Sequence, residues 1–263
     1  MAATARGTTL TEQHRKAQLR LRASFLREFV ALWALLDIEA LDETTAEWVG
    51  LSVDLVTRWR KLSAERAFQY YQDFRLAETG QALAAPATYG NLDIPNPAQI
   101  RTSLLVTGPI GYKSRLANGF TPTNARTLSF TAVSGAASRH VMDGGRNQLI
   151  NTATKDEGAV GFSRVTDGDP CAFCAMLASR GPTYFTRRTA YRTTERSKRG
   201  AGEKYHDNCG CGVEPSFDRD TDWPKRNRDF EKLWKESTKD QRGKDALNAF
   251  RRALAEQRRE NPS

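Results

Sequence analysis

The sequence predicts a mainly α-helical protein that contains one small zinc-bound α/β module. Two observations carry this prediction. Apolar residues recur at helical spacing through residues 9–79 and, less strongly, through 98–153. All four cysteines fall between residues 171 and 211, in a stretch of short apolar and polar segments separated by turns. Few large apolar side chains lie there, so we expect metal binding to supply much of its folding free energy.

Residues 1–79 are predicted to form an N-terminal helical region. Leu19, Leu26, Phe29 and Trp33 recur at spacings of seven, three and four residues. A second helix is expected over about 43–61, and a third from Ser63 onward. We interpret the aromatic stripe of these helices as core packing rather than as a cofactor or partner groove. The stripe comprises Phe29, Trp33, Trp48, Trp59, Phe68, Tyr71 and Phe74.

The rest of the chain divides at changes in composition. Glycines and prolines between residues 80 and 98 indicate a linker. A middle helical region follows over 99–158, with 133–150 as its clearest helix, although Gly144 and Gly145 lie within it. Turns at Gly108-Pro109 and Thr121-Pro122 interrupt this region. Residues 159–217 form the predicted cysteine module, and 218–263 a charged tail with two short amphipathic helices.

Charge and hydropathy limit the classes of partner. The formal net charge of +9 favours a polyanionic neighbour without specifying one. The mean hydropathy of −0.62 indicates a large solvated surface. The longest apolar run, residues 29–36, is far shorter than the ~20 residues needed to cross a bilayer. We therefore expect no membrane partner.

The cysteines indicate a zinc site. The motifs are Cys171-Ala-Phe-Cys174 and His206-Asp-Asn-Cys209-Gly-Cys211. A C-x-x-C turn directs two thiolates at one ion, and a second Cys/His cluster completes the tetrahedron that structural zinc prefers. Cys171, Cys174 and Cys209 are expected ligands, and either His206 or Cys211 is the fourth. Four protein ligands close the site, so its role would be structural. Reduced cysteines that are merely packed are the alternative.

A basic segment interrupts the module at residues 187–204, where seven Lys and Arg stand against two Glu. We expect it to be a loop that contacts nucleic acid through phosphates, because no recognition helix is visible. Its candidate nucleic-acid-binding residues are Arg187, Arg188, Arg192, Arg196, Lys198 and Arg199.

The module resembles the phage Mu protein F-like (MuF-like) minor head proteins of tailed phages. The residues that carry the resemblance are Cys171-Ala-Phe-Cys174, Arg180-Gly-Pro-Thr-Tyr184 and Tyr205-His-Asp-Asn-Cys209-Gly-Cys211-Gly-Val-Glu-Pro215. The helices of 19–79 and the segment 246–254 are similar to versions in phages of actinobacteria.

This resemblance implies a structural and assembly protein of the phage head. It would be a minor capsid protein of the virion, made in the host cytoplasm and located at the portal vertex or capsid interior. Its partners would be the portal, the major capsid protein or a scaffold, with packaged double-stranded DNA as a further partner. Two alternatives are a capsid maturation protease and an ejected internal protein that binds DNA without sequence preference. The residues give the protease little support, because His140 beside Ser134 and Ser138 is the only serine–histidine grouping. We assign no catalytic residues.

Overall fold

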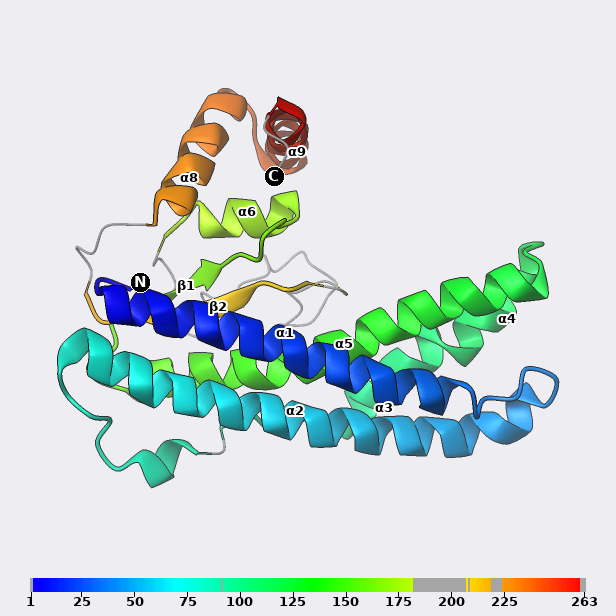
Figure 1. Ribbon diagram of the computed structural model, residues 1–263. Coiled ribbons are helices and arrows are strands. Elements are labelled where there is room, and N and C mark those ends of the chain that lie inside the picture. The colour runs from blue at the N-terminus through cyan, green and yellow to red at the C-terminus, as the bar shows by residue number, and fades with distance from the viewer. Residues whose placement is uncertain (1, 91, 182–206, 208, 219–223, 261–263) are drawn as a thin grey trace.

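Three long helices form an elongated layer in the computed structural model, which describes residues 2–90, 92–181, 207, 209–218 and 224–260 (Figure 1). The middle helix, α2, packs against both of the others. Two shorter helices and a 3₁₀ turn lie along the same layer. In chain order these elements are α1 (Ala5–Trp33), α2 (Leu41–Thr79), η1 (Pro86–Tyr89), α3 (Pro97–Thr107), α4 (Pro109–Ala117) and α5 (Pro122–Lys155).

A smaller α/β part stands on one side of this layer (Figure 1). Its two strands, β1 (Gly161–Val165) and β2 (Gly212–Ser216), pair antiparallel with Phe162 opposite Pro215. The short helix α6 (Ala172–Ala178) packs against β1 and against the C-terminal helices α8 (Lys225–Ser237) and α9 (Gly243–Glu260). The predicted mainly helical class with a small α/β part is confirmed. The two amphipathic helices predicted for the tail are α8 and α9.

Local capping signals explain several helix boundaries. Thr4 caps α1 by accepting a hydrogen bond from the Gly7 N–H at 2.9 Å. Helices α3 and α5 both begin with proline at the first position, behind the capping side chains Asn96 and Thr121. The predicted interruption at Gly108-Pro109 is the junction of α3 and α4. The predicted interruption at Thr121-Pro122 is the start of α5.

The predicted break before Ser63 is wrong, because α2 runs without interruption through this position. Ser63 is fully buried rather than being a cap. Its hydroxyl donates to Gln18 Oε1 at 2.8 Å and accepts from the Gly145 N–H at 3.1 Å. A serine that resembles a helix start thus joins α1, α2 and α5.

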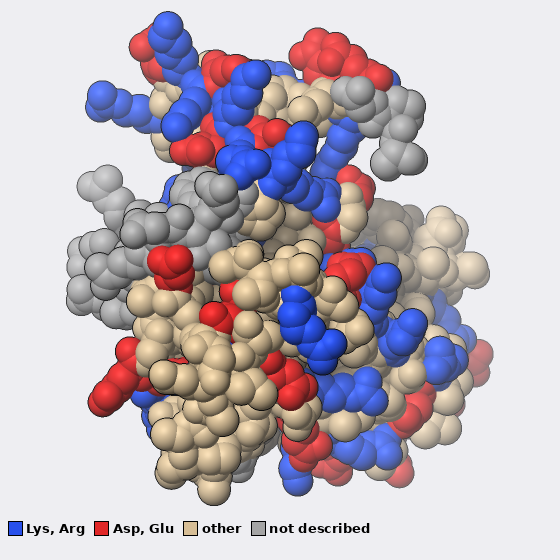
Figure 2. Space-filling view, turned by 60° about the vertical axis from the view of Figure 1, so that its left-hand side comes forward, with Lys and Arg blue, Asp and Glu red and all other residues tan. Residues whose placement is uncertain are grey.

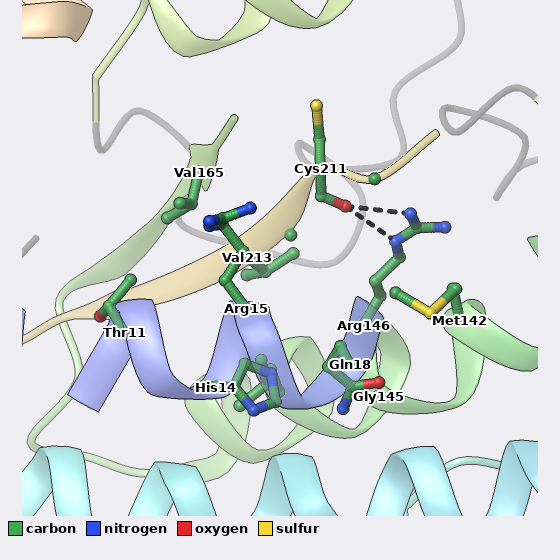
Figure 3. A pocket seen from close by; sticks show the side chains of 13 residues that line it. Thr11, His14, Arg15, Gln18, Met142, Gly145, Arg146, Val165, Cys211 and Val213 are labelled. Carbon is green, nitrogen blue, oxygen red and sulfur yellow. Dashed lines mark hydrogen bonds between the residues drawn. The ribbon is translucent and has the colours of Figure 1, made fainter. Parts of the chain in front are cut away.

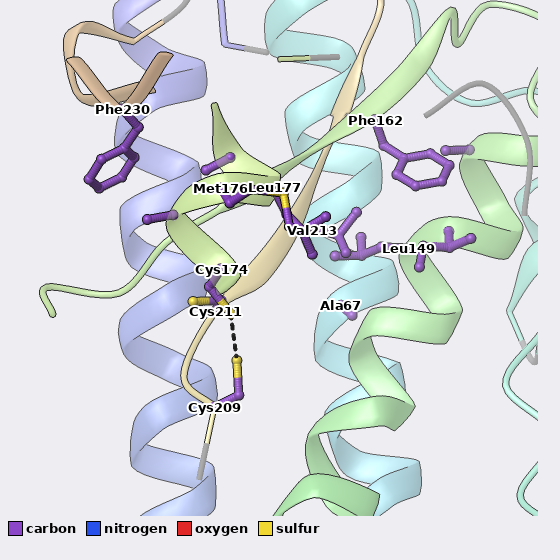
Figure 4. Packing of buried hydrophobic residues seen from close by; sticks show 14 of the residues in the cluster. Ala67, Leu149, Phe162, Cys174, Met176, Leu177, Cys209, Cys211, Val213 and Phe230 are labelled. Carbon is purple, nitrogen blue, oxygen red and sulfur yellow. Dashed lines mark hydrogen bonds between the residues drawn. The ribbon is translucent and has the colours of Figure 1, made fainter. Parts of the chain in front are cut away.

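The aromatic stripe is largely core, as predicted. Phe29, Trp33 and Trp48 are buried at the end of the layer where α1 meets α2, and Tyr71 and Phe74 are buried at the other end. The core cluster that contains Tyr71 and Phe74 extends into the α/β part. It includes Leu149, Phe162 and Cys174 (Figure 4). Three of the apolar residues in the periodic pattern are instead about half exposed: Val30, Leu51 and Leu76.

The segment between α2 and α3 is held against the helices. Arg60 of α2 makes a two-pronged ion pair with the buried Asp93, at 2.6 and 2.7 Å, and donates to the His140 carbonyl at 2.9 Å. Helices on both sides of residues 80–98 pack together. The predicted domain boundaries stay a prediction. No helix in the described part of the chain is long and apolar enough to cross a membrane.

Gly144 and Gly145 lie where α5 packs closely against α2. A Cβ atom on Gly144 would lie 2.3 Å from the Arg60 carbonyl oxygen, and one on Gly145 would lie 2.8 Å from Ser63 Oγ. The Arg60 carbonyl belongs to the backbone of α2, so it cannot move aside for a Cβ atom as a flexible side chain could. The two glycines that weaken the sequence signal for a helix are therefore what permits its packing.

Gly144→Ala should therefore lower the free energy of unfolding by about 1–3 kcal/mol in urea denaturation, because overpacking outweighs the better helix propensity of alanine. Gly50→Ala is the matched control, since this glycine also lies inside a helix but a Cβ there would meet no atom within 4 Å. The control should gain up to about 1 kcal/mol. Equal effects at both positions would contradict the close approach.

Candidate metal centre

Three thiols from two separate segments meet in the α/β part. Cys174 belongs to α6, whereas Cys209 and Cys211 both lie just before β2. All three are buried, and their sulfur atoms lie within 4.8 Å of one another. The Cys174 and Cys209 sulfurs are 3.5 Å apart (Figure 4). Sulfurs around a tetrahedral zinc ion are about 3.8 Å apart, given Zn–S bonds of ~2.3 Å, so this group fits such an ion.

Cys171 borders this group. It caps α6, and its sulfur accepts a hydrogen bond from the Cys174 N–H at 3.4 Å. This N–H···S contact is the knuckle geometry expected of a C-x-x-C metal turn. Cys171 is partly exposed and is not among the three mutually close sulfurs.

The three buried thiols form hydrogen bonds with one another, so the pKa of each depends on the others. Hydrogen bonds from Cys174 and Cys211 lower the pKa of Cys209, and the positive Arg146 acts in the same direction. Cys174 has its pKa raised, first by its hydrogen bond with Cys171 and then by that with Cys209. The positive Arg146 therefore favours the thiolate form of Cys209, and the thiolate is the form that binds metal.

Arg146 of α5 holds the backbone of residues 209–211, which we call the second knuckle; the first knuckle is the C-x-x-C turn at residues 171–174. The Arg146 guanidinium donates to the Cys209 carbonyl at 2.7 Å. It also donates to the Cys211 carbonyl at 2.9 and 3.1 Å (Figure 3). The side chain is buried and also pairs with Asp143 at 2.9 Å. On the other side, Arg164 of β1 lies 3.8 Å from the Cys174 sulfur. These two positive charges oppose the negative charge that metal-bound thiolates would carry.

Sequence reasoning missed both arginines. Arg146 contacts residues more than sixty positions away, and nothing in its own neighbourhood marks it. Its placement after two glycines in α5 is a signal only once the helix packing is known. His206 lies outside the described residues, so the choice between His206 and Cys211 as a ligand stays open. Also outside them are Arg187, Arg188, Arg192, Arg196, Lys198 and Arg199.

A small cavity lies between the second knuckle and α1 (Figure 3). Its lining includes His14, Gln18, Arg146 and Cys211, and its volume is about 30 Å³. This is room for one or two water molecules, whereas pockets for small-molecule ligands span about 300–1,000 Å³. Burial lowers the pKa of His14 to about 4, so this imidazole is neutral at pH 7.

The serine–histidine grouping on α5 lacks the geometry of a catalytic pair. His140 is buried, and burial lowers its pKa to about 3. Ser134 Oγ donates to the Thr131 carbonyl at 3.2 Å. Within the described residues, neither Ser138 Oγ nor His140 Nε2 has a hydrogen-bond partner. His140 therefore does not activate either serine in this structure.

A model of the family described as VG15 protein matches residues 7–237, so the chain belongs to this family. It is similar to the Gene 15 protein of Mycobacterium phage D29, with 24% identity over an alignment that covers 62% of this chain and 72% of that protein. No solved structure matches the chain significantly. The expected relationship to a phage protein family is confirmed, while the narrower MuF-like assignment stays a prediction.

Cys174→Ser should release the metal from purified, reduced protein and expose the α/β part to limited proteolysis, because Cys174 contacts every other cysteine of the group. Elemental analysis and protease digestion measure the two effects. Met176→Leu, a volume-conserving change in the same helix, should retain the metal. If reduced, folded wild-type protein contains no metal, the site is a cluster of packed thiols.

Arg146→Gln should weaken metal binding by about 10–100-fold, since loss of a group that hydrogen-bonds to the metal-ligating residues has effects of this size. Competition with a coloured chelator measures the affinity. Arg126→Gln removes an exposed arginine from the same helix and should leave the affinity unchanged. Unaltered affinity in Arg146→Gln would show that the knuckle does not depend on this guanidinium.

Proposed function

We propose that this chain is a structural and assembly protein of a tailed-phage head. In this proposal it is a MuF-like minor capsid protein, present in few copies at the portal vertex or the capsid interior. The observation that carries the proposal is the extent of the family match, which spans all of the structure from α1 through α8. The phage origin of the similar Gene 15 protein supports the same class.

We propose zinc as the metal, in a purely structural role. Thiolates are the donors that zinc accepts in closed tetrahedral sites, and a chain assembled in a reducing cytoplasm keeps its thiols available. Zinc would cross-link α6 to the start of β2, thereby joining the two chain segments that border the basic segment 187–204.

The proposed protein partner is the portal, the major capsid protein or a scaffold, and packaged DNA is the proposed second partner. A protein partner requires surface other than the buried Phe29 and Trp33, which are part of the helical core. The maturation-protease alternative gains no support from His140, for the geometric reasons given above.

Mass spectrometry of virions assembled from the genome that encodes the chain tests this proposal. The chain should be present in few copies per particle, and Cys174→Ser should reduce its incorporation, while Met176→Leu should not. Absence from purified virions, with the chain abundant in the producing cells, would contradict a structural role. Comparison of full particles with particles that have ejected their DNA separates a resident head protein from an ejected one.

A further inference from the structure

We propose that the outward side of α9 is a binding surface for the phosphate backbone of double-stranded DNA. This surface, the basic face, consists of Lys244, Arg251, Arg252 and Arg259, all of them exposed. The proposed function enters only in naming packaged DNA as the source of the phosphates. The basic face lies outside the family match, which ends at residue 237, and is distinct from the predicted loop at 187–204.

The packing of α9 determines which of its charges point outward. Ala246, Ala249, Phe250 and Leu254 are buried, and Phe250 meets Trp234 of α8 edge-on with ring centroids 5.2 Å apart. At 100° per residue, the four members of the basic face fall within an arc of about 100° on the opposite side. The acidic residues of α9 fall outside this arc, on its flank: Asp245, Glu256 and Glu260.

Within the residues that the structure describes, no acidic side chain pairs with the basic face. None of its four side chains makes an ion pair in the described part of the chain, and Arg251 contacts only the uncharged Asn248, at 2.9 Å. Helix α8 behaves differently, because its lysines pair with carboxylates on the same helix. These pairs are Lys225–Asp229 at 2.9 Å, Lys235–Glu231 at 2.7 Å and Lys232–Glu236 at 3.9 Å.

Charge is concentrated at this end of the molecule. Residues 224–260 hold twelve Lys and Arg against seven Asp and Glu, so they carry +5 of the chain's net charge of +9. Lys and Arg side chains crowd the surface above the helical layer in Figure 2, with acidic side chains interspersed. The basic face collects part of that excess on one helix surface.

A phosphate backbone suits this surface better than an acidic protein patch. Lys244 and Arg251 are seven residues apart, as are Arg252 and Arg259, which places each pair about 10 Å apart along the helix. The row of charges extends over about 22 Å, and duplex DNA offers a phosphate charge for every ~1.7 Å of its axis. Three of the four side chains are arginines, whose planar guanidinium can bind phosphate with two hydrogen bonds.

The basic face has a firm attachment to the cysteine module. Arg258, beside Arg259, pairs with Asp169 at 2.8 Å and also donates to the Pro170 carbonyl, directly before Cys171. Arg226 of α8 donates to the Asp167 and Gly168 carbonyls, both at 2.7 Å. Helices α8 and α9 thus both hold the loop of residues 167–170, which leads into the C-x-x-C turn.

The experiment uses the full chain and short DNA duplexes of two unrelated sequences, with fluorescence anisotropy read at several salt concentrations. The test variant replaces Lys244, Arg251, Arg252 and Arg259 with glutamine. Its plot of log affinity against log salt should be shallower than that of the wild type by about 0.9 for each lost phosphate contact, and thus by about 3–4 in total. Both duplexes should give the same result.

The matched control replaces Lys61, Lys225, Lys232 and Lys235 with glutamine. It loses the same net charge from exposed positions elsewhere, where each lysine is paired with a glutamate or aspartate. Its salt slope should match that of the wild type. Circular dichroism and metal content confirm that both variants fold.

Equal slopes for the two variants, or no binding of duplex by the wild type, would overturn the basic face as a DNA surface. Neither result affects the virion measurement, which tests the proposed function separately. Conversely, absence of the chain from virions would remove the head role and leave a measured contribution of the basic face to DNA binding intact.

Discussion

Three consecutive residues of α5 join the helical layer to the cysteine module. Gly144 and Gly145 allow α5 to lie against the backbone of α2 at Arg60 and Ser63. Arg146, two residues after Gly144, projects about 200° away around the helix and reaches the carbonyls of the second knuckle. One turn of α5 therefore determines both how closely α5 lies to α2 and where Arg146 meets the second knuckle. A shift of α5 away from α2 would carry Arg146 with it, so the positions of Cys209 and Cys211 depend on a helix contact on the opposite side of α5.

Elsewhere in the molecule, other buried arginines also hold irregular segments of the chain against the helices. Arg60 holds Asp93 in the segment after α2, and Arg75 pairs with Asp156 at 2.7 Å just beyond α5. Charges out of water are costly unless they are paired and hydrogen-bonded, so each arginine restrains the irregular chain that supplies its partners. Loss of either partner would leave an uncompensated buried charge, at a cost of about 3–5 kcal/mol. This explains how a segment rich in glycine and proline is held firmly against the helices.

Helical periodicity, proline positions and cysteine grouping made much of this architecture predictable, because each is a local property. The interruptions at Gly108-Pro109 and Thr121-Pro122, the helices α8 and α9, and the meeting of Cys174 with Cys209 and Cys211 all follow from them. The rest depends on contacts between distant residues. Ser63 resembles a helix cap until Gln18 and Gly145 are brought to it, and Arg146 is one arginine among many until α5 is placed. Likewise, the sequence of the tail shows only that charges of both signs are present. The burial of Phe250 determines which side of α9 faces outward.

X-ray absorption at the zinc edge, on the full chain purified under reducing conditions and loaded with zinc, tests the metal centre most directly. Zinc held by the cysteines should give a coordination shell of three or four sulfur atoms at about 2.3 Å. With three sulfurs, one nitrogen should complete the shell at about 2.0 Å, so the same spectrum shows whether a histidine is one of the ligands. A shell made mainly of oxygen and nitrogen, or a protein that retains no zinc, would contradict the account.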